Sequence, residues 1–307
     1  MDKQHVTSTV IITGANGFIG SHLTNFLTQN KIKVYAVIRS KTSDISLLKK
    51  NNYLSIVYCD INNIAALPEL IPNQYYDAII HLAWNGSAGK IRADYHMQLK
   101  NVEHTCNLIY TLQKIKCKRF LCMGTVSEHL TEQIFNISLP PPNLTYASAK
   151  QCSHFLTDII CKLLNQNYIW MQCGNVYGPN NFSGNLISYT VSELGKGNKT
   201  FYSSGKQILD FVYIDDVIMA IYLLIFSATT KNFYYIGSGK SKPLKDFLHE
   251  IARIYDMEDA IILNKHPDDG LEYKQEWYNI SDLIKDTGFQ PKYDFSQGIE
   301  RTIRGTK

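Results

Sequence analysis

The chain has 307 residues, of which 45% are hydrophobic and 19% are charged, a composition typical of a globular protein with a large core in one domain or two closely packed ones. Its 31 basic and 27 acidic residues give a formal charge of +4 without any basic tract, which argues against a nucleic-acid partner. No stretch reaches the roughly 18 uninterrupted apolar residues of a membrane span, and the polar start "MDKQHVTS" lacks the features of a secretory signal, so we expect no membrane association.

Short β-branched or apolar runs alternate with longer helical patterns through the first half of the chain. We predict strands at 9–13, 33–38, 55–59, 77–83 and 119–123, and helices at 18–29 and about 92–114. This alternation is typical of an α/β protein with a Rossmann-like, doubly wound parallel sheet and helices on both faces.

The pattern changes after a helix predicted from Tyr146 to about Asn165 and a strand that ends near Gln172. Beyond that strand the sequence is irregular, with short strands and helices. We therefore predict a Rossmann domain at 1–173, which includes the helix with Tyr146, and a smaller C-terminal α/β part at 174–307. The second part is expected to bind substrate over the carboxyl ends of the strands and to return some segments to the main sheet.

The cysteines and histidines form no metal-binding or disulfide pattern. Seven cysteines, an odd number, include no C-x-x-C spacing, and the nine histidines show no ligand spacing. We expect reduced thiols in the cytoplasm and neither a metal site nor a disulfide framework.

A glycine-rich turn, "TGANGFIG" at 13–20, joins the first predicted strand to the first helix. Gly14, Gly17 and Gly20 permit a tight turn, a close approach of the backbone to a diphosphate and close packing of the helix on the strand. The spacing is G-x-x-G-x-x-G and not the commoner G-x-G-x-x-G. Its place between strand and helix predicts dinucleotide binding, with a purely structural turn as the alternative.

The second predicted strand ends in "VIRSKTS", which bears on the choice of dinucleotide. An NAD site places an acid about 20 residues beyond the last glycine to bind the ribose 2′-hydroxyl. Arg39 stands there instead, with Ser40 and Lys41 behind it, and a guanidinium suits the 2′-phosphate of NADP. We therefore predict NADPH as the cofactor, with NAD as the alternative if Arg39 is solvated and Asp44 reaches the ribose.

The pentapeptide "YASAK" at 146–150 follows the proline-rich "LPPPNLT" and begins a helix. Tyr146 and Lys150 are about one turn apart, so their side chains share a face of that helix. An ammonium near a phenol favours the phenolate and lowers the tyrosine pKa, which suits proton transfer near neutral pH. The alternative is an ordinary exposed helix start.

Eight short motifs occur in order along the chain: "TGANGFIG" at 13–20, "CD" at 59–60, "HLAW" at 81–84, "NV" at 101–102, "MGTVS" at 123–127, "YASAK" at 146–150, "NVYGP" at 175–179 and "DFVYIDD" at 210–216. Together they resemble the extended short-chain dehydrogenase/reductases of the NAD-dependent epimerase/dehydratase family, which act on nucleotide sugars. The resemblance covers nearly the whole chain, including the late "GFQPKYDFSQGIERTI".

The resemblance implies a catalytic set. Tyr146 would donate or accept the hydroxyl proton, Lys150 would bind the nicotinamide ribose and lower the pKa of Tyr146, and Thr125 would hydrogen-bond the substrate oxygen. Hydride would pass between the nicotinamide and a sugar carbon. For Thr125, the alternative is a strand-end hydroxyl that caps a loop.

The same resemblance implies the residues that bind the cofactor and the substrate. Cofactor contacts are expected from Gly14, Asn16, Gly17, Phe18, Ile19, Gly20, Arg39, Ser40, Asp60, Ile61, Leu82, Ala83, Trp84, Asn101, Tyr146 and Lys150. Substrate contacts are expected from Trp84, Thr125, Ser127 and Asn175. Asp60 would bind the adenine amine, Asn101 would support the helix near the active site, and Trp84 either narrows the sugar pocket or only packs.

Departures from the family pattern favour one reaction over others. Sugar 4,6-dehydratases carry Asp and Glu directly after the catalytic hydroxyl, where this chain has Val126 and Ser127. GDP-fucose synthases carry a Cys at the position of Ser127 and a His at that of Asn180. We therefore expect neither dehydration nor double epimerisation.

The arginines with which many relatives grip the substrate diphosphate are also absent. Leu209 and Gln172 occupy their positions. Either Lys206, Lys265 or His266 replaces that grip, or the substrate differs from UDP-sugars.

We predict an NADPH-dependent reductase of a nucleotide-linked 4-keto-6-deoxy sugar, which makes a deoxyhexose precursor for surface polysaccharide. The alternatives are a nucleotide-sugar 4-epimerase that retains NAD(H) and, remotely, a non-catalytic NADP(H)-binding regulator. By resemblance, a homodimer forms through the helices at 92–114 and 146–165, unless their apolar faces pack on the sheet instead. The apolar side chains expected at that interface are Leu99, Leu108, Phe155 and Ile159.

Overall fold

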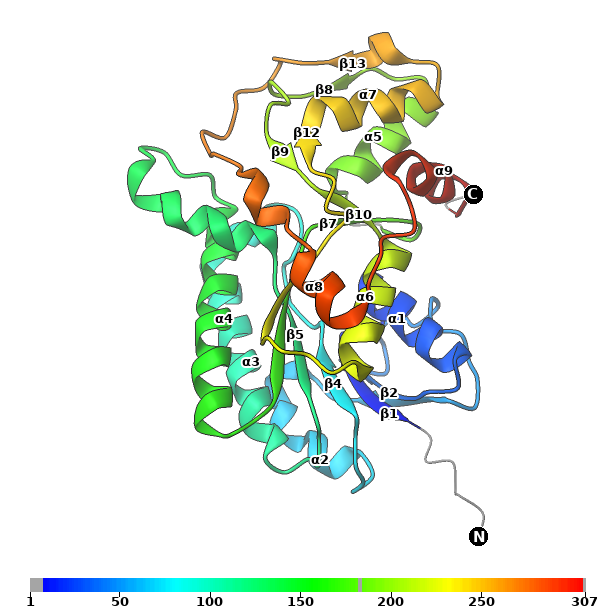
Figure 1. Ribbon diagram of the computed structural model, residues 1–307, viewed down its shortest axis with the longest axis vertical. Coiled ribbons are helices and arrows are strands. Elements are labelled where there is room, and N and C mark those ends of the chain that lie inside the picture. The colour runs from blue at the N-terminus through cyan, green and yellow to red at the C-terminus, as the bar shows by residue number, and fades with distance from the viewer. Residues whose placement is uncertain (1–7, 182–183, 306–307) are drawn as a thin grey trace.

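The computed structural model describes residues 8–181 and 184–305, so the polar start at 1–7, where we expect no secretory signal, lies outside the described residues. Seven of the strands are β1 (Thr9–Thr13), β2 (Lys33–Ile38), β3 (Leu54–Tyr58), β4 (Ala78–His81), β5 (Phe120–Met123), β6 (Tyr168–Cys173) and β11 (Phe233–Ile236). They form one sheet in the order β11-β6-β5-β4-β1-β2-β3, and every neighbouring pair is parallel (Figure 1). This arrangement confirms the Rossmann-like α/β fold. The strand order reverses between β1 and β4, which is where such sheets bind ligands.

Both faces of this sheet are buried, which explains the continuous apolar runs of its strands. Successive side chains point to opposite faces, so Val10 and Ile12 pack into one hydrophobic cluster while Ile11 packs into the other. In the register of the sheet, Ile11 lies beside Tyr35 of β2 and Ile79 of β4. The first strand is therefore the centre of the fold.

Two long helices cover each face of the sheet (Figure 1). The helices are α1 (Phe18–Gln29) and α6 (Ile214–Phe226) on one face, and α3 (Tyr95–Leu112) and α4 (Leu144–Leu163) on the other. Within residues 8–181 and 184–305, no helix has both the length and the apolar character needed to cross a membrane.

Two helices begin at other residues than predicted. α3 begins after Asp94, whose side chain caps it by accepting a hydrogen bond from the Met97 amide at 3.2 Å. Arg92, predicted on this helix, lies instead in the separate 3₁₀ turn η2 (Lys90–Ala93). α4 begins at Leu144, which places Tyr146 in its first turn.

The outer faces of α3 and α4 carry most of the apolar side chains expected at a dimer interface. Leu99, Phe155 and Ile159 are exposed there. The expectation for Leu108 is wrong, because this side chain is fully buried in the cluster that packs on the sheet. Position on the helix explains the difference, because the buried stripe of α3 includes Leu108 but not Leu99.

Three short helical segments that follow β3 and β5 are not predicted by the sequence pattern. They are η1 (Ile61–Ala66), α2 (Leu67–Leu70) and η3 (Val126–Asn136). Short and 3₁₀ helices show too little hydrophobic periodicity to be predicted. η3 begins with a capping box, in which the Glu128 side chain accepts from the Thr125 amide at 2.6 Å and the Thr125 hydroxyl accepts from the Ser127 amide at 3.3 Å.

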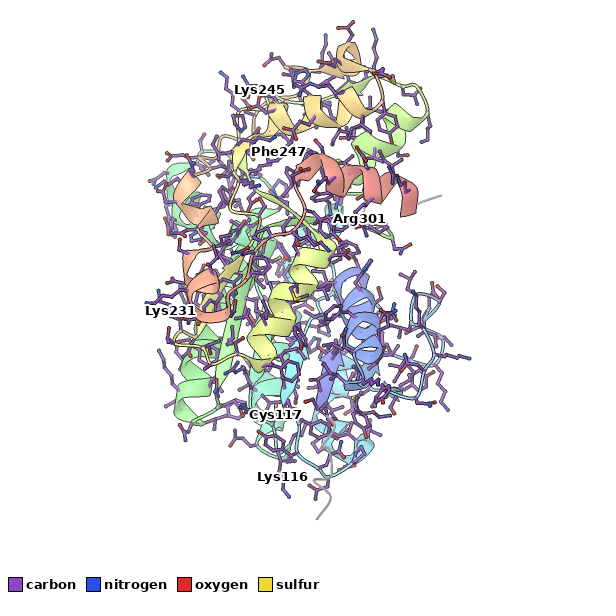
Figure 2. The ribbon with its side chains drawn as sticks, turned by 45° about the vertical axis from the view of Figure 1, so that its right-hand side comes forward. Lys116, Cys117, Lys231, Lys245, Phe247 and Arg301 are labelled. Atoms are coloured by element: carbon purple, nitrogen blue, oxygen red, sulfur yellow. The ribbon has the colours of Figure 1, made fainter. Side chains whose placement is uncertain are left out.

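The chain after β6 builds a smaller part at the carboxyl ends of the strands. Apart from α6, β11 and α8 (Ser281–Thr287), which packs on β11 and α6, its elements are β7 (Asn175–Tyr177), α5 (Leu186–Gly195), β8 (Thr200–Phe201), β9 (Ile208–Leu209), β10 (Phe211–Tyr213), β12 (Lys242–Pro243), α7 (Leu244–Ile254), η4 (Glu258–Ala260), β13 (Ile261–Ile262), η5 (Gln275–Tyr278) and α9 (Phe295–Gly305). Figure 2 shows Lys245 and Phe247 of α7 at the opposite end of the molecule from Cys117, which precedes β5. Phe247 packs edge-on against Phe211 and Phe295, with ring centroids 4.8 and 4.7 Å apart.

Candidate active site

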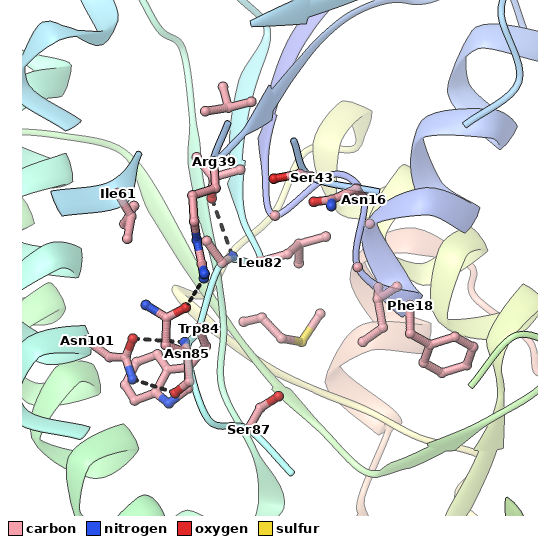
Figure 3. A pocket seen from close by; sticks show the side chains of 18 of the residues that line it. Asn16, Phe18, Arg39, Ser43, Ile61, Leu82, Trp84, Asn85, Ser87 and Asn101 are labelled. Carbon is pink, nitrogen blue, oxygen red and sulfur yellow. Dashed lines mark hydrogen bonds between the residues drawn. The ribbon is translucent and has the colours of Figure 1, made fainter. Parts of the chain in front are cut away.

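Two neighbouring cavities lie at the carboxyl ends of the central strands. Cavity A has a volume of about 610 Å³ and lies between the glycine turn after β1 and the loop after β4 (Figure 3). Cavity B has a volume of about 440 Å³ and is lined by residues of η2, η3, η5 and the segments around β7 and α5. Ser87 and Ala88 of the loop after β4 line both cavities, so the two meet at this loop.

The glycine turn forms one wall of cavity A. Gly14 has a φ of +68°, and a Cβ there would lie 2.7 Å from the backbone nitrogen of Ala83. A Cβ at Gly20 would overlap the carbonyl oxygen of Gly14, so both positions require glycine. α1 begins after Gly17 without a side-chain cap, which leaves its first amides available to an anion. These features fit the diphosphate of a dinucleotide.

Most of the expected cofactor contacts come together around cavity A. Those that line it are Gly14, Asn16, Gly17, Phe18, Ile19, Gly20, Arg39, Ile61, Leu82, Ala83, Trp84 and Asn101. Four expected contacts, Ser40, Asp60, Tyr146 and Lys150, do not line it. The Ser40 hydroxyl hydrogen-bonds that of Thr42 at 2.9 Å, and the Asp60 carboxylate caps η1 by accepting from the Asn62 amide at 2.8 Å. Their chain neighbours Ser43 and Cys59 line the wall instead.

Arg39 and Asp44 both line cavity A near the end of β2. The exposed Arg39 guanidinium donates a hydrogen bond to the side-chain oxygen of Asn85 (Figure 3). The Asp44 carboxylate accepts a hydrogen bond from the Ser46 amide at 2.8 Å, which lowers the pKa of Asp44. Cavity A thus offers both a guanidinium and a carboxylate to a bound nucleotide.

Two buried amide side chains of α3 hold the loop after β4 in place. The Asn101 side chain donates to the Asn85 carbonyl at 2.8 Å and accepts from the Asn85 amide at 2.9 Å (Figure 3). The Gln98 side chain donates to the Gly86 carbonyl at 3.0 Å and accepts from the Trp84 indole N–H at 2.8 Å. Asn101 therefore supports this loop, and Gln98 fixes the orientation of the Trp84 indole.

Tyr146 is buried and lines neither cavity, but its ring contacts a lining residue of each. Its ring packs edge-on against Trp84 of cavity A, with centroids 6.1 Å apart, and the Cζ of Arg92 from cavity B lies 4.2 Å from its centroid. Burial raises the pKa of Tyr146 to about 12, although Arg92 and a hydrogen bond with the Thr125 side chain act in the opposite direction. The phenol is therefore protonated at neutral pH, as a proton donor requires.

Lys150 lies one turn further along α4, and its ammonium is buried behind the wall of cavity A. Nζ donates to the Met123 carbonyl at 2.7 Å and lies 3.6 Å from the centroid of the Trp84 ring. Burial lowers the pKa of Lys150 to about 8. Arg92 is a cation beside Tyr146 that lowers its pKa, while the Lys150 ammonium is directed at β5 and Trp84. The expected effect of Lys150 on Tyr146 stays a prediction.

Cavity B is lined mainly by uncharged side chains. Ser127 and Asn175, both expected substrate contacts, lie on its wall. Among the described residues that line it, Arg92 alone is charged. Sequence reasoning missed Arg92, because the helical pattern of 92–114 places it at the start of a long helix. The glycine at position 89, which has a φ of +66° just before η2, was the available signal that a turn lies there.

The residues considered for a diphosphate grip lie apart from one another. Leu209 lines cavity B. Gln172 is buried, and its side-chain oxygen hydrogen-bonds His129 Nε2 at 2.9 Å. The alternatives at Lys206, Lys265 and His266 are exposed and lie outside the lining of cavity B.

A buried carboxylate ties η3 to β6 and α4. Glu128 is 1% exposed and accepts hydrogen bonds from the Thr125 amide at 2.6 Å and the Trp170 indole N–H at 3.1 Å. It also pairs with His154 Nδ1 at 3.1 Å, and the His154 ring stacks on Trp170 with centroids 4.5 Å apart. Since His154 and Tyr146 belong to the same helix, Glu128 fixes Thr125 relative to Tyr146.

Comparison with known proteins agrees with this geometry. The model of the NAD dependent epimerase/dehydratase family matches residues 10–237. CDP-abequose synthase from Salmonella typhimurium is 26% identical over 306 residues, which cover 96% of this chain and 97% of the synthase. dTDP-glucose 4,6-dehydratase from Haemophilus influenzae is 24% identical over 333 residues, which cover 96% of each protein.

Solved structures share the fold. UDP-glucuronic acid 4-epimerase from Bacillus cereus, in complex with UDP-glucuronic acid and NAD, is 24% identical with a TM-score of 0.79, over 97% of this chain and 98% of that one. UDP-glucose 4-epimerase from Thermotoga maritima, with UDP-glucose, is 18% identical with the same TM-score over the same shares. Because the family model matches more than half of the sequence, the chain belongs to the NAD dependent epimerase/dehydratase family.

Proposed function

We propose that the protein is an NADPH-dependent reductase of a nucleotide-linked 4-keto-6-deoxy sugar. The observation that carries the proposal is that one phenol, Tyr146, contacts both Trp84 of a cavity that fits a dinucleotide and Arg92 of a second cavity. No carboxylate, histidine or lysine is found among the described residues that line cavity B. Eliminating water or inverting a carbon beside the carbonyl requires such an additional acid or base, whereas reducing a ketone requires one hydride and one proton.

The residues around Tyr146 have separate parts in this reaction. NADPH, when bound in cavity A, supplies the hydride. Tyr146 donates its proton to the carbonyl oxygen as that oxygen becomes an alcohol. Thr125, held by the Glu128 capping box, hydrogen-bonds the same oxygen. Lys150 would donate to the nicotinamide ribose once the Trp84 ring, which covers its ammonium here, moves aside.

The product would be a nucleotide-linked deoxyhexose, a sugar donor suited to surface polysaccharide synthesis. We place the reaction in the cytoplasm, because all seven cysteines are free. The names of the two curated relatives make CDP and dTDP the first nucleotides to test.

A nucleotide-sugar 4-epimerase that retains NAD(H) is the second candidate. Asp44 favours it, because a carboxylate on the wall of cavity A suits a ribose 2′-hydroxyl. An epimerase first oxidises its substrate, so Tyr146 would have to act as a base. Both reactions pass a proton between Tyr146 and the sugar oxygen, so net consumption of NADPH is what distinguishes the two candidates.

The test mixes the protein with NADPH and with CDP-, dTDP- or GDP-linked 4-keto-6-deoxyhexoses, and follows the loss of NADPH absorbance. We expect one ketosugar to oxidise NADPH stoichiometrically, and NADH to react far more slowly. Arg39→Ala should weaken NADPH binding about ten- to a hundredfold and leave NADH binding unchanged. Interconversion of 4-epimers without net NADPH loss would identify the epimerase instead, and equal use of NADPH and NADH would contradict the assigned role of Arg39.

A further inference from the structure

Cavity B presents one positive charge to its ligand. A nucleoside diphosphate sugar carries two phosphate charges, and a site that binds it needs donors to neutralise them. Arg92 is the charged residue among the described residues lining this cavity. This reasoning rests on the proposed function, which makes the ligand of cavity B a nucleotide sugar.

The environment of Arg92 leaves its hydrogen-bond donors available. Its Nε is buried and has no hydrogen-bond partner, and no described residue forms an ion pair with its guanidinium. The guanidinium lies over the Tyr146 ring, with Cζ 4.2 Å from the centroid. A guanidinium placed over an aromatic face is held in position while its in-plane N–H groups can still bind an oxyanion.

Other cationic side chains near cavity B are exposed to solvent and do not line it. Lys90 belongs to the same 3₁₀ turn as Arg92 but is exposed and does not line cavity B. Lys206 and Lys265 are likewise exposed and lie outside the lining. Ser127 and Asn175 line the same cavity and add neutral polar groups beside the guanidinium.

We infer that Arg92 binds the diphosphate of the nucleotide sugar. The positive charge that binds the diphosphate thus comes from the segment after β4, which also lines cavity A. A single residue therefore contacts the proton-donating phenol and holds the anionic part of the substrate.

The test measures binding of nucleoside diphosphates to the full chain by calorimetry, in the presence of saturating NADPH. The probes are CDP, UDP, dTDP and GDP, each compared with its nucleoside. Arg92→Gln should weaken the best diphosphate about ten- to a hundredfold and leave the matching nucleoside unchanged, because only the phosphates lose a partner. Arg92→Lys keeps the charge and should fall in between. Lys90→Gln removes a charge from the same turn and should bind as the unmutated protein does.

Several results would overturn the inference. These are equal diphosphate affinity in Arg92→Gln, an equal loss for diphosphate and nucleoside, or no diphosphate binding by the unmutated protein. Normal diphosphate affinity combined with slow hydride transfer would show that Arg92 acts on Tyr146 and not on the substrate. A different result would contradict the proposed reductase function alone. In that case no ketosugar would oxidise NADPH, while diphosphate binding and its dependence on Arg92 would persist.

Discussion

Burial favours the protonated form of the Tyr146 phenol. The side chain is 8% exposed, and its pKa of about 12 keeps the phenol protonated throughout the neutral range. Its neighbours Arg92 and Thr125 stabilise the phenolate that remains after the proton has been donated. The site therefore starts the reaction with an acid in place and lowers the energy of its conjugate base.

Replacing Tyr146 by Phe keeps the ring against Trp84 and removes the hydroxyl. We expect NADPH to bind normally and single-turnover hydride transfer to a ketosugar to slow about a hundred- to ten-thousandfold, the usual contribution of general acid catalysis. Fluorescence titration measures the binding, and stopped-flow absorbance measures the transfer. Tyr110→Phe, on an exposed part of α3, is the matched control. Hydride transfer at the normal rate in Tyr146→Phe would assign the acid to another group.

The affinity for the dinucleotide should depend on the protonation of Lys150. Burial lowers its pKa to about 8, so the ammonium is complete below that pH and is lost as the pH rises through it. If the ammonium donates to the nicotinamide ribose, NADPH affinity should fall between pH 7 and 9.5, and Lys150→Met should bind weakly with little pH dependence. Fluorescence titrations across that range make the measurement. A flat profile in the unmutated protein would exclude this role for the ammonium.

Among the secondary-structure elements, η3 depends most on a single buried group. Glu128 caps its first turn, and its remaining contacts reach Trp170 of β6 and His154 of α4. Removing this carboxylate leaves the buried Trp170 donor and the partly buried donors of Thr125 and His154 without an acceptor, and such donors destabilise a fold.

Glu128→Ala should therefore lower the free energy of unfolding by about 2 to 4 kcal/mol. Urea denaturation followed by circular dichroism measures the change. Glu132→Ala, at an exposed position of the same segment, should stay within about 0.5 kcal/mol of the unmutated protein. Equal destabilisation by both substitutions would mean that the contacts of Glu128 add nothing to the free energy of unfolding.

The sequence predicts elements well where periodicity is long and poorly where one side chain sets a boundary. Strand β1 and helix α1 match their predicted ranges, because a continuous apolar run fills the strand and a helical apolar pattern fills the helix. The start of α3 depends instead on the Asp94 cap. The helix predicted from the apolar pattern therefore begins too early and includes part of η2. Because of this error, the sequence did not predict that Arg92 lines cavity B and gives it a positive charge.

Over the whole molecule, the order of the strands brings the site together. The turns after β1 and β4 lie next to each other because these strands are neighbours, although they are far apart in the chain. Motifs at both turns predicted the lining of cavity A from the sequence. The contact of Arg92 with Tyr146 and the cover of Trp84 over Lys150 depend on tertiary packing, which no local pattern encodes.

The outer face of α3 and α4 carries exposed apolar side chains. Leu99, Phe155 and Ile159 are 60%, 59% and 51% exposed there. The two helices pack on each other and on the sheet, and the described residues of the chain leave more than half of each of these side chains exposed. An exposed apolar face of this kind is typical of a protein interface.

We predict that two copies of the chain associate through this face as a homodimer. Phe155→Glu should place a charge in the interface and convert the dimer to a monomer, because an unpaired buried charge costs several kcal/mol. Light scattering at micromolar concentration measures the mass of each form. Met219→Glu adds the same charge on α6, on the other face of the sheet, and should remain dimeric. A monomer in the unmutated protein would contradict the prediction, and a dimer that survives in Phe155→Glu would place the interface elsewhere.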